Sequence, residues 1–171
     1  MQLRGDALRF VLAQGLPAVI DVIGGSMSPT IPKDTKVDVT PLAASDELAA
    51  GDIVLLATSG DVLVLHRVMA VFVEAGEAFV VHQGDAAAST FGISARRDVL
   101  ARMTGFAGDA RPVPTPERLD AAARAIFLRR RAACVVFVRA RRLARALHVS
   151  ERRPVRQCGR VFRRLARFIS G

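Results

Sequence analysis

The segment GDIVLLATSGDVLVLHRV (residues 51–68) places two short apolar runs after Gly-Asp pairs. Gly51-Asp52 predicts a turn before residues 53–57, and Gly60-Asp61 predicts a second turn before residues 62–68. Apolar runs of strand length that are bounded by Gly-Asp pairs are typical of β-hairpins. We therefore expect an antiparallel hairpin here, with His66 near the end of its second strand.

Similar patterns lie on both sides of this hairpin. Strands are predicted at residues 18–23 (AVIDVI), 35–40 (TKVDVT) and 99–106, and a second hairpin at 68–73 and 78–82. Residues 4–15 have apolar positions at helical spacing and predict a short helix that ends near Pro17. The whole pattern predicts a mainly β, antiparallel domain over about residues 16–108.

The remainder of the chain is predicted to be a basic helical extension. A proline-rich stretch at 108–116 marks a boundary, so we divide the chain into a domain at 1–114 and a tail at 115–171. Thr115 is the expected helix N-cap, with Pro116 at the first helical position. Residues 117–171 hold 16 arginines and 3 acidic residues, whereas residues 1–116 hold 9 basic and 13 acidic residues.

The tail leaves three alternatives open. Residues 155–169 predict an amphipathic helix with arginines on one face, which would suit an anionic membrane surface. Nucleic acid is a less favoured partner, because the chain has no Trp or Tyr for base stacking. The third alternative is packing on the β domain with the arginines in solvent.

Several other classes are excluded by composition. Cys134 and Cys158 fit neither a disulfide framework nor a metal-binding spacing, which favours a reducing, cytoplasmic compartment. The most apolar stretch, residues 10–24, is too short and too polar for a transmembrane helix. There is no phosphate-binding loop, dinucleotide fingerprint or metal-ligand cluster, and no cofactor is expected.

The heptapeptide GGSMSPT (residues 24–30) is the strongest candidate for chemistry. Two glycines allow a sharp turn before Ser26, and Pro29 stiffens the residues after it, so the hydroxyl would be held at a strand exit. A turn without chemistry is equally compatible with these residues. A nucleophilic serine also needs a base, and Lys33 and Lys36 are too close in sequence to lie on a neighbouring strand.

Histidine is therefore the expected base. His66 follows an apolar run and works near neutral pH without a large pKa shift. His82 is a rival base that we rank lower, and His148 lies in the basic tail. Asp85, after Gly84, could orient His66 and stabilise its imidazolium, although Gly-Asp is also an ordinary turn.

Four motifs in order, SMSPT (26–30), GDIV (51–54), HRV (66–68) and GD (84–85), resemble the signal peptidase I family, in its serine/histidine branch. The resemblance covers about residues 16–106. It implies the coiled antiparallel β-sheet fold shared with the autoproteolytic domains of SOS repressors. It also implies that Ser26 is the nucleophile, His66 the general base and Asp85 the matching acidic residue, with Arg67 in a structural role.

The resemblance further implies an oxyanion and substrate site at Ser26 and Met27, with the Ser26 N–H as a donor. Only 25 residues precede Ser26, so we expect a member without the family's N-terminal membrane anchor. The predicted function is a serine endopeptidase that processes the leader of a precursor peptide in the cytoplasm, with peripheral membrane contact through 155–169. The alternative is a catalytically silent binding or regulatory module that keeps the fold.

Overall fold

The structure, a computed structural model, describes residues 5–58, 62–87 and 90–146. Helix α1 (Gly5–Ala13) precedes the strands and helix α2 (Ala121–Ala146) follows them, with 3₁₀ turns at Arg96–Asp98 and Pro116–Arg118. The strands are β1 (Ala18–Val22), β2 (Thr35–Pro41), β3 (Ile53–Ala57), β4 (Leu63–Glu74), β5 (Glu77–Gln83), β6 (Gly92–Ala95) and β7 (Val99–Phe106).

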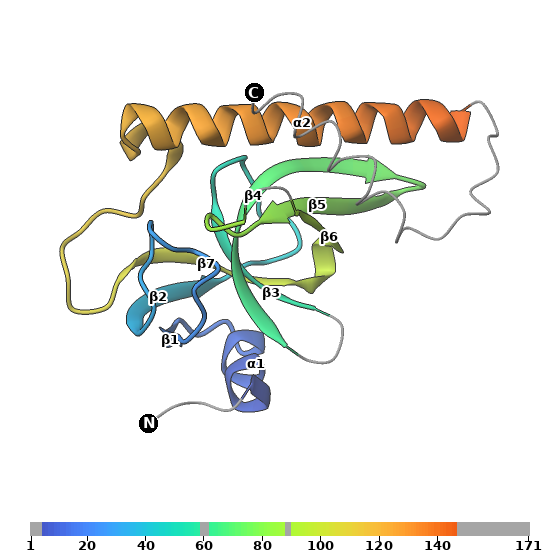
Figure 1. The fold of residues 1–171 in the computed structure, drawn as a ribbon. Helices are drawn as coiled ribbons and strands as arrows, with labels where there is room; N and C mark the ends of the chain where they lie inside the picture. The colour runs from blue at the N-terminus through green and yellow to red at the C-terminus, as the bar shows by residue number, and fades with distance from the viewer. Residues whose placement is uncertain (1–4, 59–61, 88–89, 147–171) are drawn as a thin grey trace.

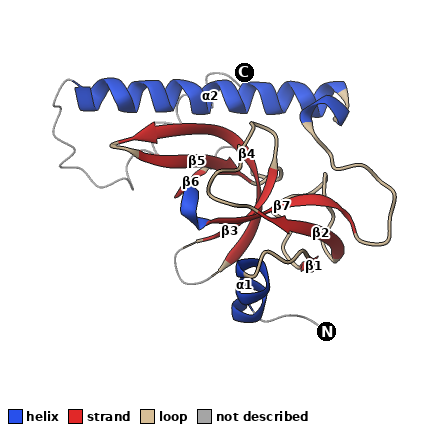
Figure 2. Ribbon diagram, turned by 180° about the vertical axis from the view of Figure 1, so that it is seen from behind, coloured by secondary structure: helices blue, strands red, loops and turns tan. Residues whose placement is uncertain are grey.

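The seven strands of the described residues form one sheet in the order β1-β2-β7-β3-β4-β5-β6, and every neighbouring pair is antiparallel. The sheet is curled, and the long strand β4 runs from the α1 end of the molecule to α2 (Figure 1). Seen from behind, β4 and β5 lie directly beneath α2 (Figure 2). The predicted mainly β, antiparallel class is thus confirmed.

Most predicted strands are present at the expected places. The hairpin of β3 and β4 pairs Ile53 with Arg67 and Ala57 with Leu63, and residues 59–61 of its turn lie outside the described residues. The two strands predicted at 62–68 and 68–73 are one continuous strand, with an irregularity in its pairing with β5 between Val68 and Ala70. Strand β6 was not predicted, because four residues without a strong apolar pattern give little signal.

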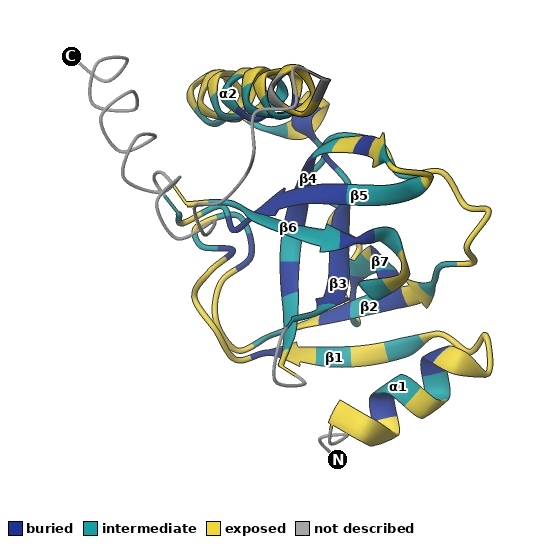
Figure 3. Cartoon of the chain, turned by 90° about the vertical axis from the view of Figure 1, so that its right-hand side faces the viewer, coloured by how far each residue is buried: buried dark blue, intermediate teal, exposed yellow. Residues whose placement is uncertain are grey.

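One part of the core lies inside the curl of the sheet. It joins Leu8 and Leu12 of α1 to buried residues of β1, β2, β3, β4 and β7. Figure 3 shows that β3 is buried along most of its length, whereas much of β1 at the sheet edge is exposed.

A second part of the core lies under α2. Phe127, Cys134 and Val138, on one face of the helix, pack against Met69 and Phe72 of β4 and against β5. The segments on the two sides of the predicted boundary at residue 114 therefore share this part of the hydrophobic core. Among the described helices, none has the length and hydropathy needed to cross a bilayer.

The N-cap of α2 differs from the predicted Thr115. Thr115 precedes the short 3₁₀ turn and makes no side-chain cap hydrogen bond. Instead the Ala123 N–H donates to Asp120 Oδ1 at 2.8 Å, so Asp120 caps the helix. The predicted helix at 155–169 lies outside the described residues.

Candidate active site

Ser26 lies on an exposed turn that also contains residues buried in the core. It follows β1 and the bend at Gly24-Gly25, and it is exposed, whereas its neighbour Met27 and Ile31 are completely buried. The Ile31 N–H donates to the Met27 carbonyl at 2.9 Å, which closes the turn. Two buried apolar side chains thus hold the backbone of the turn, while the Ser26 hydroxyl stays on the surface.

Gly84 allows the loop after β5 to approach this turn. A side chain at position 84 would begin 2.5 Å from the Ser26 carbonyl oxygen and 3.0 Å from its Cβ, so only glycine fits here without a shift of the backbone. The Ala86 N–H donates to the same carbonyl at 2.9 Å. The sequence pattern of Gly84-Asp85 was compatible with an ordinary turn, but the structure shows a close contact with Ser26.

His66 lies next to this contact. The last pair of the β4–β5 ladder is Arg67 with Gln83, so the next residues on the two strands are His66 and Gly84. Beyond this pair the chain leaves β5 at Gly84 and runs directly into the contact with Ser26. Burial lowers the pKa of His66 below its usual 6.5, and the negative charge of Asp85 partly offsets this effect. A neutral imidazole at pH 7 is the form that a general base requires.

Within the described part of the chain, no hydrogen bond joins Ser26 to His66. The His66 ring bonds instead to a second histidine, with its Nδ1 2.9 Å from Nδ1 of His82. The two rings have centroids 5.2 Å apart. Because Nδ1 is engaged in this way, Nε2 is the ring nitrogen of His66 that is left for a substrate or for Ser26.

His82 is almost fully buried, at 4% exposure, and its Nε2 lies 3.1 Å from Ser94 Oγ. Burial and the neighbouring His66 lower the pKa of His82 to about 4. Both ring nitrogens of His82, the predicted rival base, are thus engaged, one by His66 and one by Ser94. Ser94 was missed altogether, and its position two residues after Gly92 in a short edge strand offers no strong sequence signal.

The prediction that Asp85 orients His66 is wrong. Arg67 takes both carboxylate oxygens of Asp85, with Nε donating to Oδ1 at 2.9 Å and Nη2 to Oδ2 at 2.6 Å. Nη1 of Arg67 also donates to the carbonyl oxygens of Gly51 and Pro114. A bidentate pair with a buried guanidinium outcompetes a neutral imidazole for the carboxylate. Asp85 therefore acts on His66 only through its charge, and Arg67 has the structural role that was expected.

The lysines do not lie at the site. Lys33 and Lys36 are both exposed, and Lys36 lies opposite Asp21 in the pairing of β1 with β2. The sequence argued against a Ser/Lys pair. Neither lysine is buried, and burial is what would lower the pKa of a lysine enough to make it a base. The described residues contain no cluster of three or more side chains suited to hold a metal ion.

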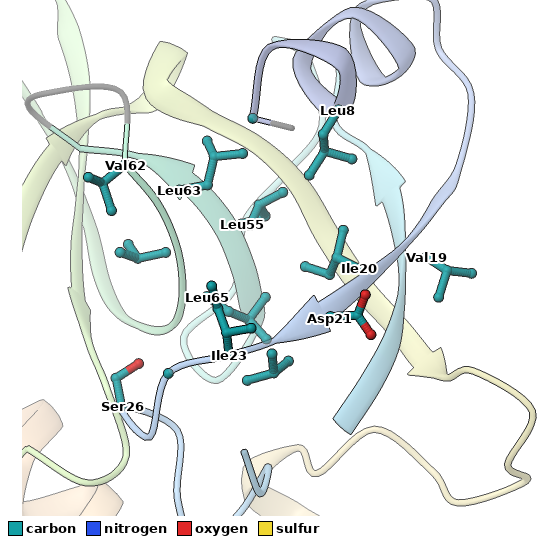
Figure 4. Close-up of a pocket in the computed structure, with 14 residues that line it drawn as sticks. Leu8, Val19, Ile20, Asp21, Ile23, Ser26, Leu55, Val62, Leu63 and Leu65 are labelled. Atoms are coloured by element: carbon teal, nitrogen blue, oxygen red, sulfur yellow. The ribbon is translucent and has the colours of Figure 1, made fainter. Parts of the chain in front are cut away.

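A pocket of about 530 Å³ opens beside Ser26. Figure 4 shows Ser26 at one end of it, with the hydroxyl directed to the side on which Leu65 lies. The walls come from β1 on one side and the start of β4 on the other, with Leu8 and Leu55 contributing, and most of the side chains are apolar. A pocket of this volume and lining suits apolar groups of a ligand.

Two strand edges without partners face this pocket. Among the residues that the structure describes, β1 pairs only with β2, and β4 pairs with β5 only from Arg67 onward, so Leu63–His66 has a neighbour on one side alone. Such edges present unpaired N–H and C=O groups that can bond to an added strand.

Comparisons with protein-family models, curated proteins and solved structures each find no match to this chain. The resemblance to the signal peptidase I family therefore stays a prediction.

Proposed function

We propose that this chain is a serine endopeptidase, similar to the serine/histidine branch of the signal peptidase I family, that cleaves a peptide or protein precursor. One observation carries this proposal. An exposed serine stands at the end of an apolar pocket, and the Gly84 loop that contacts it leaves β5 directly after Gln83, which pairs with the residue next to the half-buried His66. Covalent catalysis requires nucleophile, base and binding surface to be adjacent, and this arrangement of the Ser26 turn, the Gly84 loop and the start of β4 supports that requirement.

The reaction would proceed through an acyl-enzyme. His66 takes the Ser26 Oγ proton on Nε2 while Oγ attacks the scissile carbonyl carbon. The imidazolium then protonates the leaving amine as the C–N bond breaks. Water attacks the resulting ester, giving its proton to His66, and Ser26 is restored as the new carboxyl group leaves. Closure of Ser26 onto His66 accompanies substrate binding in this scheme, since such contacts often tighten only in the complex.

The Ser26 turn also offers donors for the oxyanion. Within the described residues, the backbone N–H groups of Ser26 and Met27 donate to no acceptor. The Met27 side chain is completely buried, so the backbone at this point is held in place before the reaction begins. Preorganised donors of this kind typically contribute about 10²- to 10³-fold to kcat.

The substrate would lie as an extended strand between β1 and the first half of β4. Backbone hydrogen bonds to the two free edges would give affinity, and the apolar pocket would select small apolar side chains near the cleaved bond. The basic tail at 155–169 belongs to this proposal as a contact with an anionic membrane surface.

An alkyl fluorophosphonate probe tests the nucleophile. We expect it to label the full chain at Ser26 and to label the Ser28→Ala variant equally, since Ser28 lies on the same turn but does not line the pocket. His66→Ala should slow labelling by about 10²- to 10⁴-fold. A wild-type chain that is not labelled, or that is labelled no faster than Ser26→Ala, would contradict the proposal.

A peptide-binding module without catalysis is the second candidate. The His66 ring bonds to His82 and not to Ser26, which favours this module, and the free edges and the pocket would serve binding equally well. The probe separates the two functions. A binding module predicts an inert Ser26 with retained affinity for extended apolar peptides, whereas a peptidase predicts Ser26 labelling that depends on His66.

A further inference from the structure

His66 is the first member of a row of three polar side chains that crosses neighbouring strands of the sheet. The His66 and His82 rings meet through their Nδ1 atoms at 2.9 Å, and His82 Nε2 meets Ser94 Oγ at 3.1 Å. The row runs across three neighbouring strands, from β4 through β5 to β6. It therefore ends on the edge strand β6, and none of its three members lines the pocket beside Ser26.

The space for His82 is built into strand β6. His82 pairs with Gly92 in the β5–β6 ladder, and a Cβ at Gly92 would lie 2.4 Å from Cε1 and 2.6 Å from Nε2 of the His82 ring. Any other residue at position 92 would displace the imidazole. The absent side chain at 92 leaves space for the ring, whose Nε2 reaches Ser94, two residues further along β6.

The hydrogen-bond chemistry of the row admits two directions. In one, His66 Nδ1–H donates to His82 Nδ1, and His82 Nε2–H donates to Ser94. In the other, the Ser94 hydroxyl donates to His82 Nε2, and His82 Nδ1–H donates to His66 Nδ1. Only the first direction leaves a lone pair on His66 Nε2, because in the second direction Nε2 carries the proton.

We propose that His82, held by Ser94, is a positioning residue that fixes His66 in the Nδ1–H tautomer and so makes Nε2 the basic nitrogen. This inference rests on the proposed function for its catalytic meaning, while the tautomer itself is a property of the resting protein. His82 thereby occupies the place that a carboxylate has in a Ser-His-Asp triad. The carboxylate nearby, Asp85, is already bound by Arg67.

Two further observations agree with this role. An imidazolium on His66 carries N–H on both nitrogens, so its neighbour must be a neutral acceptor at Nδ1. Burial and the neighbouring His66 hold the pKa of His82 at about 4, which keeps it neutral at pH 7. Because a neutral acceptor stabilises an imidazolium less than a carboxylate does, the charge of Asp85 supplies part of that stabilisation.

Nitrogen NMR of the histidine rings tests the tautomer directly. The chain has three histidines, and His148→Gln identifies the third in the full-length ¹⁵N-histidine-labelled protein. At pH 7 we expect a protonated Nδ1 and an unprotonated Nε2 on His66, and the reverse pattern on His82. A His66 ring with protonated Nε2 and bare Nδ1 would overturn the proposal.

Two matched variants separate positioning from packing. In His82→Asn the amide oxygen lies near the place of Nδ1 and keeps an acceptor for His66, whereas in His82→Gln the amide reaches toward Ser94 instead. We expect His66 to keep its tautomer in the Asn variant and lose it in the Gln variant. Ser26 labelling by the fluorophosphonate should fall about 10²- to 10⁴-fold in the Gln variant only.

The outcomes distinguish the two proposals. Equal behaviour of the Asn and Gln variants, in tautomer and in labelling, would show that His82 only fills space and would overturn the positioning role. If the tautomers follow the prediction but wild-type Ser26 is never labelled, the peptidase function fails while the positioning of His66 stands. Ser94→Ala, which removes only the last contact, should give a His66 tautomer mixture and a smaller loss of labelling.

Discussion

The two halves of strand β4 are built for different tasks. The first half, Leu63–His66, pairs within the described residues with β3 alone, and Leu63, Val64 and Leu65 line the pocket beside Ser26. The second half pairs with β5 up to Glu74 and is covered by α2, with Met69 and Phe72 packed in the core. One strand thus provides an open edge for a ligand and, a few residues later, the rigid support that holds this edge in place.

Arg67 lies where the two halves meet, and its removal should have the largest effect on stability. Arg67→Ala would leave the carboxylate of Asp85 and the carbonyl oxygens of Gly51 and Pro114 without their donor in a buried region. Breaking a buried pair in this way typically costs about 3–5 kcal/mol. We expect that loss in the free energy of unfolding measured in urea.

Arg97→Ala is the matched control for this variant. Arg97 pairs with Glu77, but its side chain is 75% exposed. Exposed pairs contribute about 0–1 kcal/mol, so this variant should unfold almost as the wild type does. If the two variants lose similar amounts of unfolding free energy, the buried contacts of Arg67 do not stabilise the fold as the structure indicates.

The histidine pair at the same junction predicts a loss of stability in acid. The pKa of His82 is about 4 in the folded chain and 6.5 in the unfolded chain, so the unfolded state binds the proton more readily. The stability that neutral His82 contributes is therefore complete above pH 6.5 and is lost as the pH falls toward about 4. The difference corresponds to roughly 3 kcal/mol.

Urea unfolding at pH 7 and pH 4.5 measures this effect. In His82→Gln, which has no titrating ring, the loss between these two pH values should be smaller than in the wild type. An equal loss in both proteins would assign the acid sensitivity to the carboxylates and would contradict the neutral, buried state of His82.

Bulky substitutions at the two ends of β4 should have smaller and contrasting effects on peptide binding. Leu63→Trp fills part of the pocket, whereas Val73→Trp adds the same side chain at an exposed position of the covered half. Displacing one apolar side chain of a ligand costs about 1.5–3 kcal/mol, or roughly 10- to 100-fold in affinity. Fluorescence anisotropy with an extended apolar peptide should show weaker binding for the Leu63 variant only.

Much of the sheet was predictable because its signals are local. Gly-Asp turns and apolar runs of strand length predicted β1, β2, β3, β5 and β7 at nearly the observed bounds. The exposed Ser26 turn followed from the two glycines and the prolines around it. These features depend on neighbouring residues in sequence, so a single chain carries enough information to place them.

The polar contacts of the site depend on residues that are distant in sequence, and here the predictions failed. Asp85 was assigned to His66, yet the adjacent Arg67 takes it, because a guanidinium offers a bidentate fit that an imidazole does not. His82 and Ser94 became neighbours of His66 only through the register of β4, β5 and β6. Strand pairing of this kind cannot be derived from local patterns alone.

Cleavage of a proteome-derived peptide library, with mass spectrometry of the new termini, tests the central claim most directly. The wild-type chain and the Ser28→Ala variant should produce the same new termini, each generated next to small apolar residues, and Ser26→Ala should produce none above background. Unchanged cleavage by Ser26→Ala would contradict the assignment of the nucleophile. If the wild type cleaves no peptide but still binds peptides of the library, the result would favour the binding module instead.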